Sequence, residues 1–277
     1  MRVIDAHQHF WALSTPGHEW PTPAEPLLHR DFGPADLVSE AAGVPLAATV
    51  LVQSQPTDAD TDWMLALAAQ TPEIAAVVGW ADLAAADAPA RIARLAAHPK
   101  LRGLRPMLQA IPETDWLLDP ALEPAVAAMV EHGLRLDALV QPRHLPMLAR
   151  FAERWPDLPI VIDHAAKPAA AHGILDPWRD EIALLARRGL WCKLSGLRTE
   201  QAPGQPADAL GPYVAHLVDC FGDRLMWGSD WPVLLLSGDG YPDWLDTALR
   251  LSGLSGAKKE RLLAGAAEQF YGLERDA

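Results

Sequence analysis

Cysteine is scarce in this sequence, and neither a long apolar run nor an excess of basic residues is present. The two cysteines, Cys192 and Cys220, are too few for a disulfide framework and are typical of a reducing compartment. No apolar run could span a bilayer and no signal-peptide pattern opens the chain, so we expect a cytoplasmic protein without membrane contact. The formal net charge of −13 argues against a nucleic-acid partner, because phosphate contacts need a basic surface.

Short apolar, β-branched runs alternate with helical segments along the chain, and half of the residues are hydrophobic, which is enough for a large core. The expected strands cover residues 3–9, 47–53, 75–80, 101–106, 134–140, 160–164, 190–195 and 225–230. Helical segments lie between these strands, and the last expected helix covers residues 257–270. Prolines forbid a long helix in residues 11–36, so we expect a long first loop there that folds over a site.

Eight strand–helix alternations predict a single closed (β/α)8 TIM barrel, regular or distorted, that spans residues 1–277 as one domain. Active sites of such barrels lie at the C-terminal ends of the strands. A doubly wound open sheet is the alternative, but that fold usually carries a glycine-rich loop after its first strand. Here His7, Gln8 and His9 occupy that place, which favours the barrel.

The first strand opens with apolar residues and ends with ionisable ones. Alternate side chains of a strand point the same way, so His7 and His9 are expected side by side with Asp5 beneath them. Two adjacent imidazoles can bind a metal, polarise a carbonyl or relay protons. The alternative is a pair of surface histidines at a frayed terminus, so the interpretation depends on the other strand ends.

Other predicted strands also end in chemistry-bearing residues, namely Arg105, His164 and Asp230. Each has a plain structural alternative, since His164 could pack as a neutral core residue, Asp230 could cap a turn and Arg105 could pair with a carboxylate. Lys193, on the seventh strand, could point outward. The agreement of several strand ends nevertheless predicts one site at the barrel mouth. Tryptophans near these ends suit either the core or the wall of a ligand cleft.

Seven segments that contain these residues resemble the amidohydrolase superfamily. Within it they resemble the lactonase branch, which includes L-fuconolactonases, rhamnonolactonase-like enzymes and, more distantly, 2-pyrone-4,6-dicarboxylate lactonases. The segments are residues 5–11, 51–53, 78–83, 101–105, 163–168, 191–197 and 226–232. The resemblance extends over nearly the full length of the chain and implies a hydrolase that opens a small lactone, with a sugar lactone favoured.

By position, the resemblance implies that Asp230 activates water against the lactone carbonyl. It implies that His7, His9 and His164 polarise that carbonyl or hold a metal ion. Substrate contacts are expected from Arg105, Gln53, Trp80, Lys193, Trp11 and Trp231. Because lactone esters are more electrophilic than amides, this chemistry needs little Lewis-acid help.

The pattern departs from metal-rich members of the superfamily in two places. Arg105 stands where binuclear members carry a bridging lysine or glutamate, and residues 134–140 contain no histidine. We therefore expect either no required cofactor or one divalent ion, zinc by preference, bound weakly through His7, His9 and Asp230. The alternatives are a mononuclear metal-dependent hydrolase or decarboxylase on the same barrel, and a barrel that binds a small molecule without catalysis.

Overall fold

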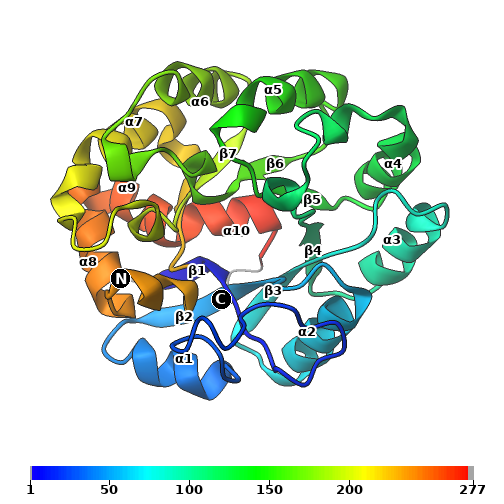
Figure 1. Ribbon diagram of the computed structural model, residues 1–277, viewed down its shortest axis with the longest axis horizontal. Coiled ribbons are helices and arrows are strands. Elements are labelled where there is room, and N and C mark those ends of the chain that lie inside the picture. Colours follow the sequence, from blue (N-terminus) through cyan, green and yellow to red (C-terminus); the bar gives the residue numbers. More distant parts are fainter. Residues whose placement is uncertain (1, 274–277) are drawn as a thin grey trace.

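The computed structural model describes residues 2–273, and its eight strands form one parallel sheet in chain order (Figure 1). The strands are β1 (Val3–Gln8), β2 (Leu46–Val52), β3 (Ile74–Gly79), β4 (Leu101–Leu104), β5 (Arg135–Ala138), β6 (Ile160–Ile162), β7 (Trp191–Leu194) and β8 (Leu225–Trp227). The helices are α1 (Pro34–Glu40), α2 (Asp58–Gln70), α3 (Ala88–Ala96), α4 (Glu123–Glu131), α5 (Leu145–Arg154), α6 (Trp178–Arg187), α7 (Gly211–Phe221), α8 (Tyr241–Ser252), α9 (Gly256–Glu260) and α10 (Ala266–Tyr271).

The sheet closes between β1 and the residues that follow β8. Gln8 forms a parallel bridge with Trp231, and the His9 N–H donates to the Trp231 carbonyl at 2.8 Å. The Asp230 N–H donates to the His7 carbonyl at the same distance. These bonds complete a barrel with helices around it, so the predicted (β/α)8 fold is confirmed (Figure 1).

Each of the eight strands ends one to three residues earlier than its sequence suggested, and after two of them the backbone turns sharply. His164 follows β6 with φ of 52°, and Asp230 follows β8 with φ of 58°. A positive φ leaves the β region, so the backbone turns away from the ladder before each of these side chains. The expected helix 257–270 is also divided, because a π-helical turn over Arg261–Gly265 separates α9 from α10.

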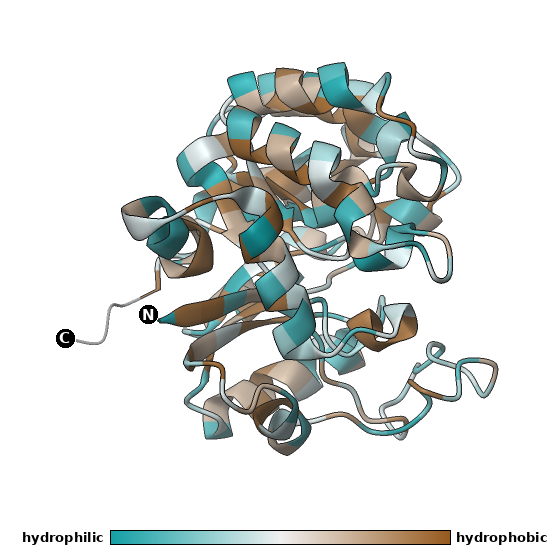
Figure 2. Cartoon of the chain, turned by 90° about the vertical axis from the view of Figure 1, so that its left-hand side faces the viewer, coloured by the Kyte–Doolittle hydropathy of each residue, from teal (hydrophilic) through white to brown (hydrophobic). Residues whose placement is uncertain are grey.

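Apolar residues pack in two layers, one between the strands and helices and one inside the barrel. The inner group contains Val50, Val78, Val161 and Met226, and Phe270 of α10 packs against it. In Figure 2 the strands are mainly hydrophobic, whereas the surrounding helices mix hydrophobic and hydrophilic residues. The apolar inner group and α10 do not occupy the C-terminal ends of the strands, and polar side chains lie there instead.

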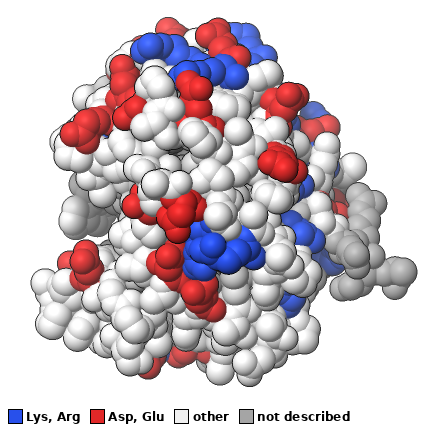
Figure 3. Space-filling model, turned by 90° about the vertical axis from the view of Figure 1, so that its right-hand side faces the viewer, with Lys and Arg blue, Asp and Glu red and all other residues white. Residues whose placement is uncertain are grey.

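Charged residues of both signs are interspersed on the face that carries α3 and α4 (Figure 3). Arg91 of α3, for example, pairs with Asp58 at 3.1 Å and with Asp62 at 2.8 Å, both on α2. Among residues 2–273, no helix has both the length and the apolar character that a membrane crossing requires.

Candidate active site

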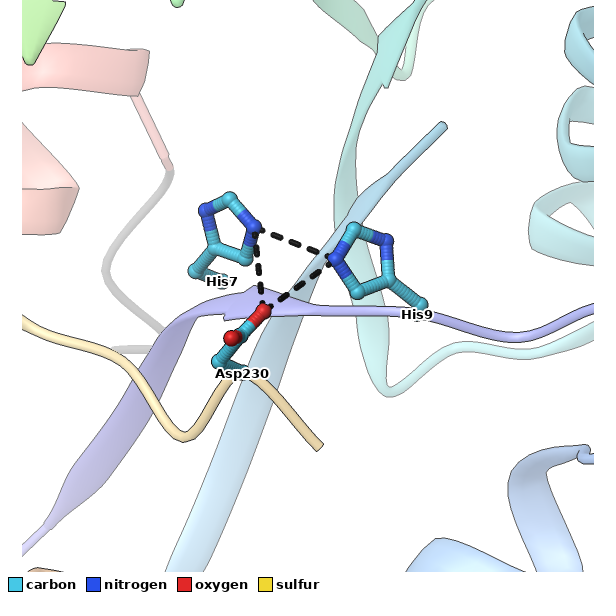
Figure 4. A group of neighbouring side chains, drawn as sticks. All are labelled: His7, His9 and Asp230. Atoms are coloured by element: carbon cyan, nitrogen blue, oxygen red, sulfur yellow. Dashed lines mark hydrogen bonds and ion pairs between the residues drawn. The ribbon is translucent and has the colours of Figure 1, made fainter. Parts of the chain in front are cut away.

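His7, His9 and Asp230 meet at the C-terminal end of the barrel (Figure 4). The Nε2 atoms of His7 and His9 are 3.2 Å apart. Oδ1 of Asp230 lies 3.4 Å from Nε2 of His9 and 3.7 Å from Nε2 of His7. All three side chains are almost fully buried, so their electrostatic interactions are only weakly screened by water.

This group has the spacing of a mononuclear metal site. Ligand atoms of a tetrahedral zinc site, at bond lengths of about 2.0–2.1 Å, stand about 3.3 Å from one another, close to the separations here. His9 also bonds through Nδ1 to the Val52 carbonyl at 2.8 Å, which leaves its Nε2 lone pair free. Nη1 of Arg105 lies 3.3 Å from Nε2 of His7 and competes for that lone pair. The side chains of His7, His9 and Asp230 therefore fit one metal ion, and competition from Arg105 weakens its binding.

Asp5 does not lie beneath the histidines as its spacing suggested. The β1–β2 pairing shifts register between Asp5 and Gln8, so strict alternation of side chains fails there. The Asp5 carboxylate instead accepts bonds from the Ser229 N–H at 2.9 Å and the Ser229 hydroxyl at 2.6 Å. Burial raises the pKa of Asp5 to about 6, although these bonds oppose the shift. Its role is to fix β1 to the loop that carries Asp230.

His164 reaches the same group from the loop after β6. Its Nε2 lies 3.8 Å from Oδ1 of Asp230, and its Nδ1 is 2.9 Å from the Ser195 hydroxyl. Gly196 makes this approach feasible, because a Cβ there would lie 2.4 Å from Nδ1 of His164. Burial lowers the pKa of His164 to about 4, so its imidazole is neutral near pH 7.

Arg105 is buried beside the histidines, and part of its hydrogen-bonding capacity is already used. Its Nη2 donates to the Gln53 carbonyl, and its Nη1 lies 3.4 Å from Asp163. Gln53, in turn, donates through Nε2 to the Arg105 carbonyl at 2.9 Å. Gln53 was expected to contact substrate; it is fully buried and holds Arg105 in place.

Lys193 lies one layer below the mouth and has no exposed surface. Its Nζ is 2.5 Å from Asp137, 3.0 Å from Asp163 and 3.1 Å from Nδ1 of His7. The Tyr271 hydroxyl of α10 donates to Asp137 at 2.7 Å. Burial followed by the Lys193 charge lowers the pKa of His7, which keeps this imidazole neutral. Lys193 was expected at the substrate, but the structure places it beneath His7.

Asp230 is held as a carboxylate by its neighbours. Burial alone would raise its pKa, but the electrostatic interaction with the His164 ring, a hydrogen bond from His9 and the interaction with the His7 ring outweigh that effect and hold the pKa well below its usual range. For Asp163, too, burial is outweighed, here by Lys193 and His7, and its pKa is lowered. The site thus contains a buried carboxylate that is ionised at neutral pH beside the neutral imidazoles of His7 and His164.

A cavity of about 390 Å³ opens above these groups. Its lining includes Trp20, Gln55, Arg105, His164, Lys167 and Asp230. Trp20 belongs to the long first loop and is held there by the Gln55 side chain. Oε1 of Gln55 accepts from the Trp20 N–H at 3.3 Å, and Nε2 of Gln55 donates to the Trp20 carbonyl. The loop expected over the site therefore supplies one of the cavity walls.

The tryptophans expected at the mouth occupy other places. Trp11 and Trp231 are each about 1% exposed and pack against Phe32. Trp80 is fixed through its backbone by the Thr61 hydroxyl and is absent from the cavity lining. Trp20 lines the cavity instead of these three tryptophans. Its position could not be predicted, because hydrophobic periodicity does not indicate how a loop folds.

Several residues that shape the site were not predicted from the sequence. Asp163 and Lys167 lie in segment 163–168, which carries the family resemblance, and Asp137 lies within the apolar strand 134–140. A charged residue in the middle of a buried strand is the signal that could have revealed Asp137, because burial of a carboxylate requires a partner.

The fold and this geometry together define a class. Residues 4–273 match the Amidohydrolase family, and the chain belongs to that family. It is 48% identical to an L-fucono-1,5-lactonase of Burkholderia ambifaria, over 98% of this chain and 96% of the relative. An L-fucono-1,5-lactonase of Burkholderia multivorans is 36% identical, over 99% of this chain and 97% of the relative. The chain is thus a homologue of sugar lactone hydrolases.

Solved structures agree with this assignment. A crystal structure of an amidohydrolase from Burkholderia multivorans with bound zinc superposes with a TM-score of 0.92 at 34% identity, covering 99% of this chain and all of that one. A putative 2-pyrone-4,6-dicarboxylic acid hydrolase from Pseudomonas putida superposes with a TM-score of 0.81 at 26% identity, covering 99% and 98% of the two chains.

Proposed function

We propose that this protein is a lactonase that hydrolyses the ester ring of a sugar lactone, with L-fucono-1,5-lactone and close analogues as the first candidates. The observation that carries the proposal is the buried Asp230 carboxylate, 3.4 to 3.8 Å from three imidazoles at the base of a cavity of about 390 Å³. The 48% identity to an L-fucono-1,5-lactonase over 98% of the chain supports the same reaction.

In the proposed reaction, Asp230 accepts a proton from a water molecule while the water oxygen attacks the lactone carbonyl carbon. Arg105 and the histidines stabilise the charge that develops on the carbonyl oxygen. When the tetrahedral intermediate collapses, the ring C–O bond breaks and the leaving oxygen takes the proton from Asp230. The product is a hydroxy acid, and the carboxylate of Asp230 is restored. General-base catalysis of this kind contributes about 10²- to 10⁴-fold.

One divalent ion, with zinc the first candidate, would be held by His7, His9 and Asp230. Such an ion would polarise the carbonyl oxygen as a Lewis acid. Arg105, 3.3 Å from Nε2 of His7, supplies positive charge at the same place, so the reaction does not depend on the ion. We expect at most one ion per chain.

The charge of the cavity favours a neutral substrate. Arg105 faces Asp163 at 3.4 Å, and Lys167 faces Glu200 at 3.6 Å, so both lining cations already have carboxylate partners. Glu19 adds a further carboxylate to the wall. A dicarboxylate would meet little net positive charge, whereas the hydroxyl groups of a sugar lactone suit such paired donors and acceptors.

A panel of aldonolactones, assayed by the acid that ring opening releases, tests the proposal. Elemental analysis of the same sample measures its metal content. We expect rapid opening of at least one six-membered sugar lactone, retained after chelation, with no more than one zinc per chain. Absence of turnover across the panel, with a folded protein, would contradict the assignment. Two ions per chain would contradict the proposed metal site.

A further inference from the structure

Four consecutive residues after β6 adopt the left-handed conformation. From His164 to Lys167 the φ angles are 52°, 51°, 60° and 52°, and none of the four residues is a glycine. This backbone is costly for L-amino acids and persists only where the surroundings fix it. The Lys167 N–H bonds to the His164 carbonyl at 2.8 Å, and Nε1 of Trp178 donates to the Ala165 carbonyl at 2.7 Å.

The turn brings two of its side chains to the same cavity. His164 and Lys167 both line it, although Ala165 and Ala166 between them are fully buried. A right-handed or extended backbone over these residues would direct the two side chains differently. The costly conformation therefore has a use, which is to place a lysine beside the imidazole that faces Asp230.

Lys167 differs from Arg105, the other cation among the described lining residues. Arg105 is almost fully buried and bonded to Gln53, whereas the Lys167 and Glu200 side chains are each 24% exposed and stand 3.6 Å apart. A pair at this distance and exposure can open, which frees the ammonium for a ligand. Burial raises the pKa of the Glu200 carboxyl, and the negative charge of Asp230 raises it further. The two carboxylates therefore repel each other.

We propose that Lys167 binds the substrate and that its pairing with Glu200 sets the charge selectivity of the cavity. This inference rests on the proposed lactone hydrolysis. Lys167 donates hydrogen bonds to oxygen atoms of a neutral lactone, while Glu200 cancels its attraction for an acidic one. An anionic lactone would also face repulsion from Glu200 and Asp230, so selectivity arises as much from repulsion as from attraction.

Two single variants and their combination test the proposal on two substrates, L-fucono-1,5-lactone and the 1,4-lactone of glucaric acid, which carries a carboxylate. Lys167→Met should raise KM for the neutral lactone about tenfold, since a charged hydrogen bond is lost, and change kcat much less. Glu200→Gln should raise kcat/KM for the anionic lactone relative to the neutral one by about tenfold. The double variant should lose that gain, because it lacks the freed ammonium.

Matched controls remove the same charges elsewhere. Glu153→Gln on α5 and Lys258→Met on α9 alter exposed residues that do not line the cavity and should leave the turnover of both substrates unaffected. Because each variant is compared with the wild type on the same two lactones, their difference in ring size cancels.

Three results would overturn the inference while the wild type opens the neutral lactone: an unchanged KM in Lys167→Met, an unchanged substrate ratio in Glu200→Gln, or a gain that persists in the double variant. A wild type that opens neither lactone contradicts the proposed function instead, and this inference falls with it. The two failures are therefore distinguishable from the wild-type measurement alone.

Discussion

Asp5 and Ser229 are 224 positions apart in the chain and are joined by two hydrogen bonds of 2.9 and 2.6 Å. The bonds link β1 to the residue just before Asp230 and add to the backbone bonds between His7 and Asp230 and between His9 and Trp231, so together they position the two histidines and the carboxylate. The Ser229 hydroxyl also accepts from the Trp231 N–H at 2.9 Å, which fixes the loop on both sides of Asp230. The position of Asp230 is thus set independently of its own carboxylate.

Replacement of Asp230 by Asn should abolish most of the activity without unfolding the protein. Asn tolerates the left-handed backbone at this position, φ 58°, nearly as well as Asp, and Ser229 still anchors the loop. Loss of the general base should lower kcat about 10²- to 10⁴-fold. Lactone turnover and circular dichroism measured on one sample check both statements. Activity within threefold of wild type would assign the base to another residue, with His164 as the next candidate.

The pH profile should lack an acid limb near 6.5, the ordinary pKa of histidine. Asp230 has a lowered pKa and stays ionised as pH falls, while His164, with its pKa lowered to about 4, stays neutral until the pH approaches that value. Both active forms are therefore present from about pH 5 upward. We expect the Asp230 and His164 pair to lower kcat/KM only as pH drops towards about 4, and any decrease near pH 6 to arise from Asp5, whose pKa is raised to about 6. A midpoint between 6 and 7 that persists in an Asp5→Asn variant would contradict this arrangement.

Replacement of Gly196 by Ala should displace His164 and lower activity. The new Cβ would lie 2.4 Å from Nδ1 and 2.6 Å from Cγ of that imidazole, far inside contact distance. Gly204 provides the matched control, because it also has a positive φ, 75° against 63°, but a Cβ there meets nothing within 4 Å. Gly204→Ala should therefore show the backbone cost alone, measured as a shift in Tm, with kcat retained. Equal losses of kcat in both variants would refute the steric explanation.

Replacement of Lys193 by Met should destabilise the fold more than it changes substrate affinity. The variant leaves Asp137 and Asp163 buried without their shared cation, and breaking a buried ion pair costs about 3–5 kcal/mol. Tyr271→Phe removes one hydrogen bond to Asp137 and should cost about 1–3 kcal/mol. Urea unfolding of both variants measures these free energies. A stable Lys193→Met protein with a raised KM would instead indicate direct substrate contact.

The order and number of the strands could be predicted from sequence, because each is a short apolar run followed by a helical segment. The C-terminal end of a barrel strand also tells which residues gather at the mouth, and His7, His9, Arg105, His164 and Asp230 do gather there. The C-terminal ends of all eight strands were placed one to three residues too late, and the left-handed backbone at His164 and Asp230 was not indicated by the sequence. The helix preference of residues 257–270 likewise gave no sign of the π-helical turn.

Depth within the barrel and the walls of the cavity could not be predicted in the same way. Lys193 and Asp230 both belong to strand-end motifs, yet one is fully buried below His7 and the other faces the cavity. The difference depends on the tilt and register of the strands, which a single sequence does not encode locally. Trp20 shows the same limit, because its place depends on the distant Gln55.

The contact between Gln55 and Trp20 has a consequence for the evolution of such a protein. The wall comes from a loop between β1 and α1 and is held by one glutamine after β2, whereas the acid–base groups are held by separate bonds. Insertions or exchanges within that loop can remodel the ligand-facing surface and leave the reacting groups where they are. A barrel of this kind can acquire a new ligand specificity when one surface loop is replaced, while its reacting groups and their chemistry are retained.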